Sequence, residues 1–348
     1  MSDLLEEGGE YGIKRTGPDE YQFNLTIPAD EQGLISRGCI DENCSPGYFK
    51  VKIGTGITAD QKVAYCPYCR KSAEPSEFLS KSQRKYLTDV MTTEIYKGMD
   101  KGIRSALELD SSGKRILGSG MFSAELSMEP SHLPKVDPPI EMTIRRDITC
   151  PNCGLVHAVF GLATWCPDCG SDIFLSHLEK ELESISKAIS AIEQRRKDLG
   201  NRVADRDIEN SLEDIVSIFE AVLKFIIKRY LLNKGTTVEE VNELIEKRIR
   251  NQFQNPTSAM ELINEIAGIN LFDGIPEQDI TFVKTSFVKR RPITHNLGVI
   301  DRKYLDRAIN GELEGNEIRI TVDEVERLLS LTRTIISNLY SLIIINEK

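Results

Sequence analysis

The sequence lacks the hydrophobic segments that would carry a protein into or across a membrane. It contains no stretch of about eighteen consecutive apolar residues, the length that a membrane-spanning helix needs. The chain opens with the acidic MSDLLEEGGE, whereas a secretory signal opens basic and continues apolar. We therefore expect a soluble, cytoplasmic protein that has no membrane partner.

The sequence also lacks a surplus of positive charge. Its 44 Lys and Arg residues face 54 Asp and Glu residues, which gives a formal net charge of −10 and disfavours non-specific attraction to a polyanion. Two stretches depart from this average. Residues 62–104 hold nine basic and five acidic side chains, and residues 284–307 hold seven basic and two acidic ones. Any contact with nucleic acid would use these stretches, which could equally be solvated faces.

What the sequence does contain is eight cysteines in two groups of four. In the second group, Cys150-x2-Cys153 and Cys166-x2-Cys169 are separated by twelve residues, and both pairs lie in Cys-Pro-x-Cys-Gly turns. Two intervening residues let both sulfurs converge on one tetrahedral metal ion, so a zinc site is favoured over disulfides in a cytoplasmic chain. Four cysteines complete the shell, so we expect His157, which lies between the pairs, to be an ordinary strand residue.

The first group is less regular, because Cys39-x4-Cys44 and Cys66-x2-Cys69 are separated by twenty-one residues. Cys66-Pro-Tyr-Cys69 also matches the active-site tetrapeptide of glutaredoxins, but no βαβ pattern of that fold surrounds it. We predict a second zinc ion here. A shell of four cysteines leaves no open coordination position, so both ions are expected to be structural.

Helical periodicity dominates the rest of the chain. We expect a helix over residues 76–107, a spacer helix over 176–199 and mainly helices from 205 onward. Capping boxes are predicted at Thr236 with Glu239 and at Thr321 with Glu324. The last helix ends in apolar residues, which we expect to form a surface for self-association. These residues are Leu342, Ile343, Ile344 and Ile345.

These observations predict a multidomain α+β protein, since 348 residues exceed one ordinary core. Two small β zinc ribbons with associated helices would precede an all-helical bundle. The predicted parts are a tail and strand (1–30), a first ribbon module with helices (31–125), a Pro-rich linker around Pro130, Pro134, Pro138 and Pro139 (126–142), a second ribbon (143–175), a spacer helix (176–200) and the helical domain (201–348).

The helical part contains one candidate active site, Arg290-x4-His295, in the basic segment FVKRRPITHNLGVIDRKY. Residues 296–304 follow the pattern Asn-x-Gly-Val-Ile-Asp-x-x-Tyr, and EGNEIRIT precedes the final helix. With these motifs, residues 205–345 resemble the HEPN superfamily, whose helical domains carry an arginine, four to six residues and a histidine at a helix junction.

The resemblance implies a metal-independent endoribonuclease, usually a homodimer in which two such motifs face one cleft. Family members occur in host-defence and toxin systems. Arg290 would clamp the phosphate, and His295 would act as the acid or base. Lys289, Arg291 and Asn296 would assist in binding RNA, while the ribbons would recognise a target or partner protein.

An alternative remains open, because Arg291 stands where active family members often carry a small polar residue, and Pro292 follows it. The chain could be a non-catalytic adaptor that dimerises through its helices and binds nucleic acid or a partner protein. Arg290 and His295 would then only belong to a satisfied polar cluster.

Overall fold

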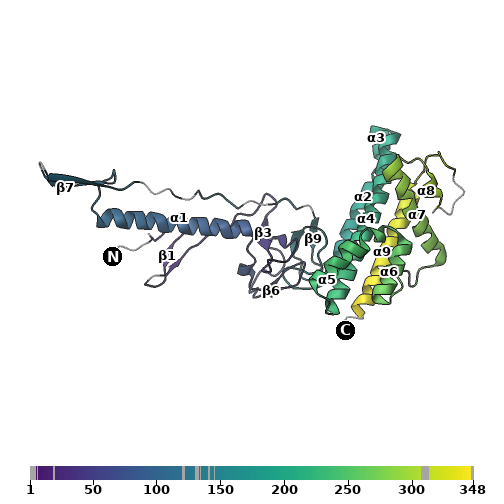
Figure 1. The fold of residues 1–348 in the computed structure, drawn as a ribbon, viewed down its shortest axis with the longest axis horizontal. Coiled ribbons are helices and arrows are strands. Elements are labelled where there is room, and N and C mark those ends of the chain that lie inside the picture. Colours follow the sequence, from purple (N-terminus) through teal and green to yellow (C-terminus); the bar gives the residue numbers. More distant parts are fainter. Residues whose placement is uncertain are drawn as a thin grey trace. The chain divides into compact units, whose positions relative to one another are not determined.

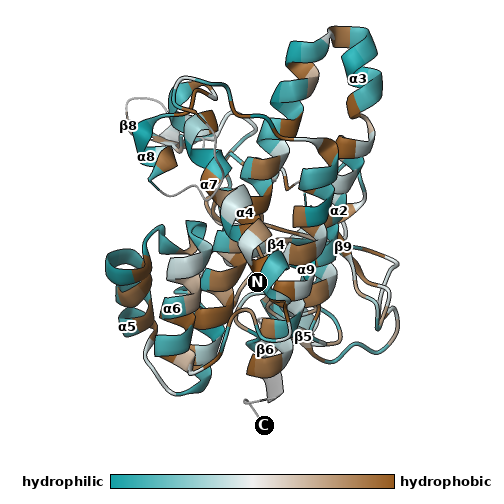
Figure 2. Ribbon diagram, turned by 90° about the vertical axis from the view of Figure 1, so that its right-hand side faces the viewer, coloured by the Kyte–Doolittle hydropathy of each residue, from teal (hydrophilic) through white to brown (hydrophobic). Residues whose placement is uncertain are grey.

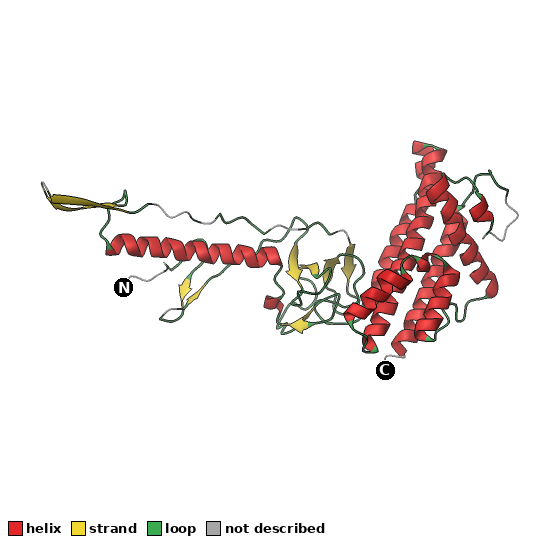
Figure 3. Cartoon of the chain, viewed as in Figure 1, coloured by secondary structure: helices red, strands yellow, loops and turns green. Residues whose placement is uncertain are grey.

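The computed structural model describes residues 5, 7–18, 20–119, 122–129, 133, 135–139, 142–144, 146–306 and 313–345. The chain divides into two units, Met1–Ile173 and Phe174–Lys348, which we call the cysteine unit and the helical unit. All described strands belong to the cysteine unit, as Figures 1 and 3 show.

The cysteine unit is organised around one four-stranded antiparallel sheet. Its strands lie in the order β3 (Leu34–Gly38), β4 (Tyr48–Lys52), β10 (Val156–Val159) and β9 (Arg146–Thr149). β4 pairs with β10, so residues 34–73 and 146–173, which we call the two cysteine segments, share one sheet, whereas the sequence predicted two separate ribbon modules. A lone two-stranded hairpin is marginally stable in water. The pairing of β4 with β10 joins the hairpins β3–β4 and β9–β10 into one larger sheet.

A common hydrophobic core lies against this sheet. Phe49 from β4 packs edge-on against Phe78, with ring centroids 6.1 Å apart, and both side chains are almost fully buried. Ile148, Leu155 and Ile173 from the second cysteine segment join the same cluster. Three of the cysteines, Cys66, Cys150 and Cys166, are buried in it as well. The two cysteine groups therefore depend on one core.

The other elements of this unit are one long helix and three short strand pairs. The predicted helix over 76–107 is confirmed as α1, which begins after a capping box between Ser80 and Gln83. The strand predicted within residues 1–30 is present as the two-residue strands β1 and β2, and β7 with β8 was not predicted. The bounds are β1 (Lys14–Arg15) with β2 (Tyr21–Gln22), β5 (Ala64–Tyr65) with β6 (Ser72–Ala73), η1 (Pro75–Glu77), α1 (Lys81–Ala106), and β7 (Lys114–Ser119) with β8 (Phe122–Ser127).

The predicted Pro-rich linker is described only in part. Pro130 and Pro134 lie outside the described residues. Beyond the end of β8, the described positions up to residue 142, including Pro138 and Pro139, belong to no helix or strand, as a proline-rich segment leads one to expect.

The helical unit is built around α4, which contacts α2, α3, α7 and α9. Residues such as Ile215, Phe219 and Val222 are fully buried along α4. Figure 2 shows that the helices of this unit alternate hydrophobic and hydrophilic stretches. The bounds are α2 (Phe174–Ser190), α3 (Ile192–Leu199), α4 (Asn201–Asn233), α5 (Val238–Glu243), the π-helical turn η2 (Leu244–Ile249), η3 (Gln252–Gln254), α6 (Pro256–Ala267), α7 (Glu277–Asn296), α8 (Arg302–Leu305) and α9 (Val322–Ile345).

The helix over 176–199 is not the spacer that the sequence predicted. It forms α2 and α3, and α2 packs against α4 and α9. Phe174 stacks on Tyr340 and on Phe225, with ring centroids 4.3 and 5.3 Å apart. Burying the apolar stripe of α2, which includes Leu178 and Leu182, is more favourable than exposing that stripe to water along a spacer helix.

The helix ends follow the predicted chemistry with one shift. The capping box of α9 is confirmed, because the Thr321 and Glu324 side chains each accept the other residue's backbone N–H. The box of α5 uses Thr237 and Glu240, one residue later than predicted. The Thr236 N–H already donates to the Leu231 carbonyl and so closes the preceding helix.

The apolar end of α9 differs from the predicted association surface. Ile343 is fully buried within the helical unit and Leu342 is half-buried. The side chains of Ile344 and Ile345 lie outside the described residues. Ile343 therefore supports the monomer core rather than an exposed patch.

Among the described residues, no helix combines the length and the apolar character needed to cross a bilayer.

The shared core leads to a first prediction. Phe49→Ala should lower the free energy of unfolding by about 3–5 kcal/mol, because the truncation leaves a cavity in a fully packed site. The effect should reach both cysteine segments. Urea unfolding measures it when the reactivity of all eight cysteine thiols is used to monitor the unfolding. Ile53→Ala is the control, since Ile53 is 65 % exposed and should matter little. Loosening of one segment alone would contradict the shared core.

Candidate metal centres and candidate active site

The eight cysteines form two clusters with the dimensions of tetrahedral metal sites. In the first, Sγ atoms of Cys39 and Cys69 are 3.6 Å apart, and those of Cys44 and Cys66 are 3.7 Å apart. A tetrahedron with Zn–S bonds of about 2.3 Å has edges of about 3.8 Å. A disulfide would need about 2.05 Å. Within each cluster all four sulfurs lie within 4.8 Å of one another.

The second cluster repeats this geometry. Cys150 and Cys169 place their sulfurs 3.7 Å apart, and Cys153 and Cys166 place theirs 3.5 Å apart. Each cluster is therefore positioned to bind one zinc ion, which makes two ions in all, as the cysteine spacing predicted. His157 lies in β10, where it pairs with Val51 of β4, and is confirmed as a buried strand residue.

Three of the cysteine pairs lie on turns of one kind. The first cysteine's N–H donates to the carbonyl five residues later, and its carbonyl accepts the N–H four residues later. These bonds join Cys66 to Lys71 and Arg70, Cys150 to Leu155 and Gly154, and Cys166 to Ser171 and Gly170. The fourth position after each first cysteine has a positive φ, which glycine adopts freely but Arg70 adopts at a cost, with a φ of 63°. Arg70 lies 4.1 Å over the Trp165 ring, a contact that helps to offset this cost.

Each cluster needs a cation to be fully deprotonated. Contact with the Cys39 thiol, and then burial, raises the pKa of Cys44 and of Cys66. Burial likewise raises the pKa of Cys166, and raises that of Cys153 to about 11. Four crowded sulfurs repel one another as thiolates, and a zinc ion removes this repulsion. The donor set therefore fits zinc, which would supply cross-linking rather than catalysis.

A second prediction concerns metal removal. The purified chain should carry two zinc ions, and Cys166→Ser should lose the ion of its cluster together with much of the stability of the unit. Structural zinc contributes folding free energy of order 10 kcal/mol in small zinc peptides. Zinc occupancy should fall as the pH falls, since protons compete for the thiolates. Metal analysis and thermal unfolding test this, and a metal-free chain with intact stability would contradict it.

The candidate active site is a pocket of about 730 Å³ in the helical unit, and both Arg290 and His295 line it. α7 supplies these two residues, with His295 exposed in its last turn. The facing wall comes from the segment Asn251–Ser258, which contains η3 and the start of α6. The sequence placed the motif at a helix junction, but α7 continues through Pro292 to Asn296.

Contacts on two sides orient the Arg290 guanidinium. Its Nη1 donates to the Gln254 Oε1 over 2.7 Å, and its Nε lies 3.5 Å from the Glu213 Oε2. Gln254 is itself held, because its Nε2 donates to Glu220 over 2.6 Å. The Thr294 hydroxyl also contacts Glu213. A guanidinium has five N–H donors, more than these two contacts use, so it can still bind an anion in the pocket.

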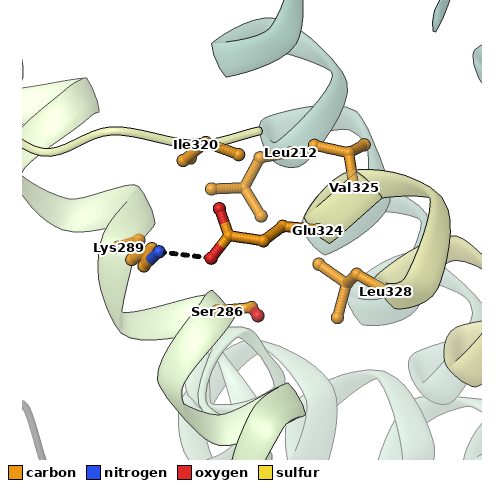
Figure 4. Close-up of a pocket in the computed structure, with 7 residues that line it drawn as sticks. All are labelled: Leu212, Ser286, Lys289, Ile320, Glu324, Val325 and Leu328. Carbon is orange, nitrogen blue, oxygen red and sulfur yellow. Dashed lines mark hydrogen bonds and ion pairs between the residues drawn. The ribbon is translucent and has the colours of Figure 1, made fainter. Parts of the chain in front are cut away.

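Of the three residues predicted to assist in binding RNA, only Arg291 lines the pocket. Arg291 lines the pocket and pairs with Asp301 over 3.6 Å. Lys289 does not line it. Its side chain lies in the interior, where its Nζ pairs with Glu324 over 2.7 Å, as Figure 4 shows. Asn296 is exposed, and its amide donates to the Val299 carbonyl rather than to the pocket.

Sequence reasoning missed the residues that face or hold Arg290. Gln254, Glu213 and the segment Asn251–Ser258 come from other elements. Asn255-Pro256 carries a helix-start signal, with the Asn255 Oδ1 accepting the N–H groups of Thr257 and Ser258. That signal predicts α6 but not its position beside α7.

Comparisons of the chain with models of protein families, with characterised proteins and with solved structures find no match.

The burial of Lys289 leads to a third prediction. Burial favours the neutral Glu324 carboxyl, but hydrogen bonds from Lys289 and from the Thr321 backbone outweigh it, so the pKa of Glu324 lies below its ordinary value of 4.5. The resulting stability is complete above about pH 4.5 and is lost as the pH falls through the lower folded value.

Glu324→Gln should therefore destabilise the chain by about 1–3 kcal/mol at neutral pH, and by less in acid. Urea unfolding of both proteins between neutral pH and pH 3 measures this difference. Glu326→Gln, an exposed change on the same helix, is the control. A difference that stays constant with pH would argue against a charged Lys289–Glu324 pair.

Proposed function

We propose that this chain is a metal-independent endoribonuclease of HEPN type that cleaves RNA through Arg290 and His295. The observation that supports this proposal most directly is that both residues of the motif line the same pocket. Lys284 and Arg291 line it as well, so its α7 wall is cationic. A cationic wall of this kind is suited to a phosphodiester.

The chemistry follows from the residue types. A ribose 2′-hydroxyl loses a proton and its oxygen attacks the adjacent phosphorus, while the bond from phosphorus to the 5′-oxygen breaks and that oxygen gains a proton. The products are a 2′,3′-cyclic phosphate and a 5′-hydroxyl. Imidazole titrates near neutral pH, so His295 can accept or donate one of these protons. Arg290 stabilises the charge that builds on the phosphate oxygens.

The reaction transfers two protons, and each chain offers one histidine at this pocket. A homodimer that joins two pockets would supply the second His295, in keeping with the arrangement that the family resemblance implies. Exposed apolar residues next to the motif suit such a contact, since Leu297 is 76 % exposed and Val299 is also exposed. In this proposal the zinc sites hold the cysteine unit in a shape that recognises a target or partner.

One observation favours the adaptor function instead. Arg290 and Arg291 each lie beside a carboxylate, that of Glu213 and that of Asp301, so both positive charges are balanced without RNA. An adaptor would keep the helical unit for dimerisation and would bind nucleic acid or a protein without cleavage.

A fourth prediction separates the two functions. His295→Ala should reduce RNA cleavage by about a hundredfold or more without loss of stability, because a positioned acid or base contributes about that much. Arg290→Lys should also be impaired, since an ammonium cannot reproduce the planar guanidinium fork.

The assay uses the full chain with mixed RNA and with a chelator mild enough to leave the fold intact. Products should end in 2′,3′-cyclic phosphate, and DNA should survive because it lacks the 2′-hydroxyl. Equal cleavage by the wild-type and His295→Ala proteins, or intact RNA at every pH tested, would favour the adaptor. Light scattering of the same samples tests for the dimer.

A further inference from the structure

The wall of the pocket that faces α7 differs in chemistry from the α7 wall. It includes Asn251, Thr257 and Ser258, whose side chains carry an amide and two hydroxyls and no charge. The α7 wall adds Val288 between its cationic residues, which offers an apolar surface. The pocket therefore has a cationic part and a neutral, hydrogen-bonding part.

The hydrogen bonds of this wall show which groups remain for a ligand. The Asn255 Oδ1 already accepts the N–H groups of Thr257 and Ser258, and Pro256 has no N–H. The start of α6 thus offers no free amide to an anion. Gln254 is committed at both ends, to Arg290 and Glu220. Asn251 is exposed, and its side-chain amide forms no hydrogen bond with another described residue.

The backbone next to Asn251 is strained. The preceding residue, Arg250, has a φ of 48° and a ψ of −114°, a conformation that residues with a Cβ rarely adopt. It ends the π-helical turn Leu244–Ile249, and its N–H donates to the Ile245 carbonyl over 2.8 Å. Both strained residues and π-helical turns are frequent at functional sites.

We infer that Asn251, Thr257 and Ser258 form a subsite for one nucleobase of single-stranded RNA. A carboxamide presents a donor and an acceptor side by side, which matches the edge of a base. The adjacent phosphate would lie at Arg290 and His295, and the base would lie over Val288. The inference rests on the proposed function for the phosphate position, and it adds that cleavage depends on the base.

Binding measured without cleavage tests this subsite. The full-length His295→Ala protein is titrated with labelled short RNA homopolymers of A, C and U, and affinity is followed by fluorescence anisotropy. Affinities should differ by about fivefold or more between bases, the effect of one bidentate base contact. Adding Asn251→Ala or Thr257→Val should make them equal. Adding Asn264→Ala, an exposed change on α6, should leave the differences unchanged.

The outcomes distinguish this inference from the proposed function. Equal affinities for all three RNAs, in a protein whose wild type cleaves RNA, would overturn the subsite alone. Failure of the chain either to bind or to cleave RNA would overturn both. Free nucleoside monophosphates are tested as a second ligand. Binding to them as tight as to the oligomers would overturn RNA as the source of the base, and weaker binding would support it.

Discussion

The antiparallel pairing of β4 with β10 is the interaction on which the cysteine unit depends. It joins segments about a hundred residues apart and places Phe49 and Leu155 in one core, beside cysteines of both clusters. The strands have only four or five residues each, and each cluster takes two of its cysteines from before its strand and two from after it. Metal binding and strand pairing therefore stabilise each other, since both fix the same short turns.

In the helical unit, α4 has the corresponding role. It buries one side against α2, α7 and α9, and its Glu213 and Glu220 reach the polar groups around Arg290. The same helix thus supplies the core and the carboxylates that orient the guanidinium. Positioning of this kind matters for catalysis, because a group that is already oriented costs little reorganisation during the reaction.

Local features of both units could be predicted from the sequence. Cysteine spacing predicted the ligands of each metal cluster, and the Thr321–Glu324 box predicted the start of α9. Contacts between distant segments could not be predicted, because periodicity shows which residues are apolar but not which helix or strand covers them. Lys289 and Arg290 are adjacent in the sequence, yet one pairs with Glu324 in the interior and the other lines the pocket. Only the packing of α9 and η3 against α7 distinguishes them.

The proposed function requires that His295 lie where a phosphodiester binds. The most direct test follows its imidazole by NMR while the full chain is titrated with 2′-O-methyl RNA, which the proposed reaction cannot cleave. The other described histidines, His157 and His177, are fully buried, and the His295→Ala spectrum assigns the signal. The proposed position of His295 requires its resonances to shift in step with RNA binding. RNA binding that leaves them unchanged at saturation would contradict it.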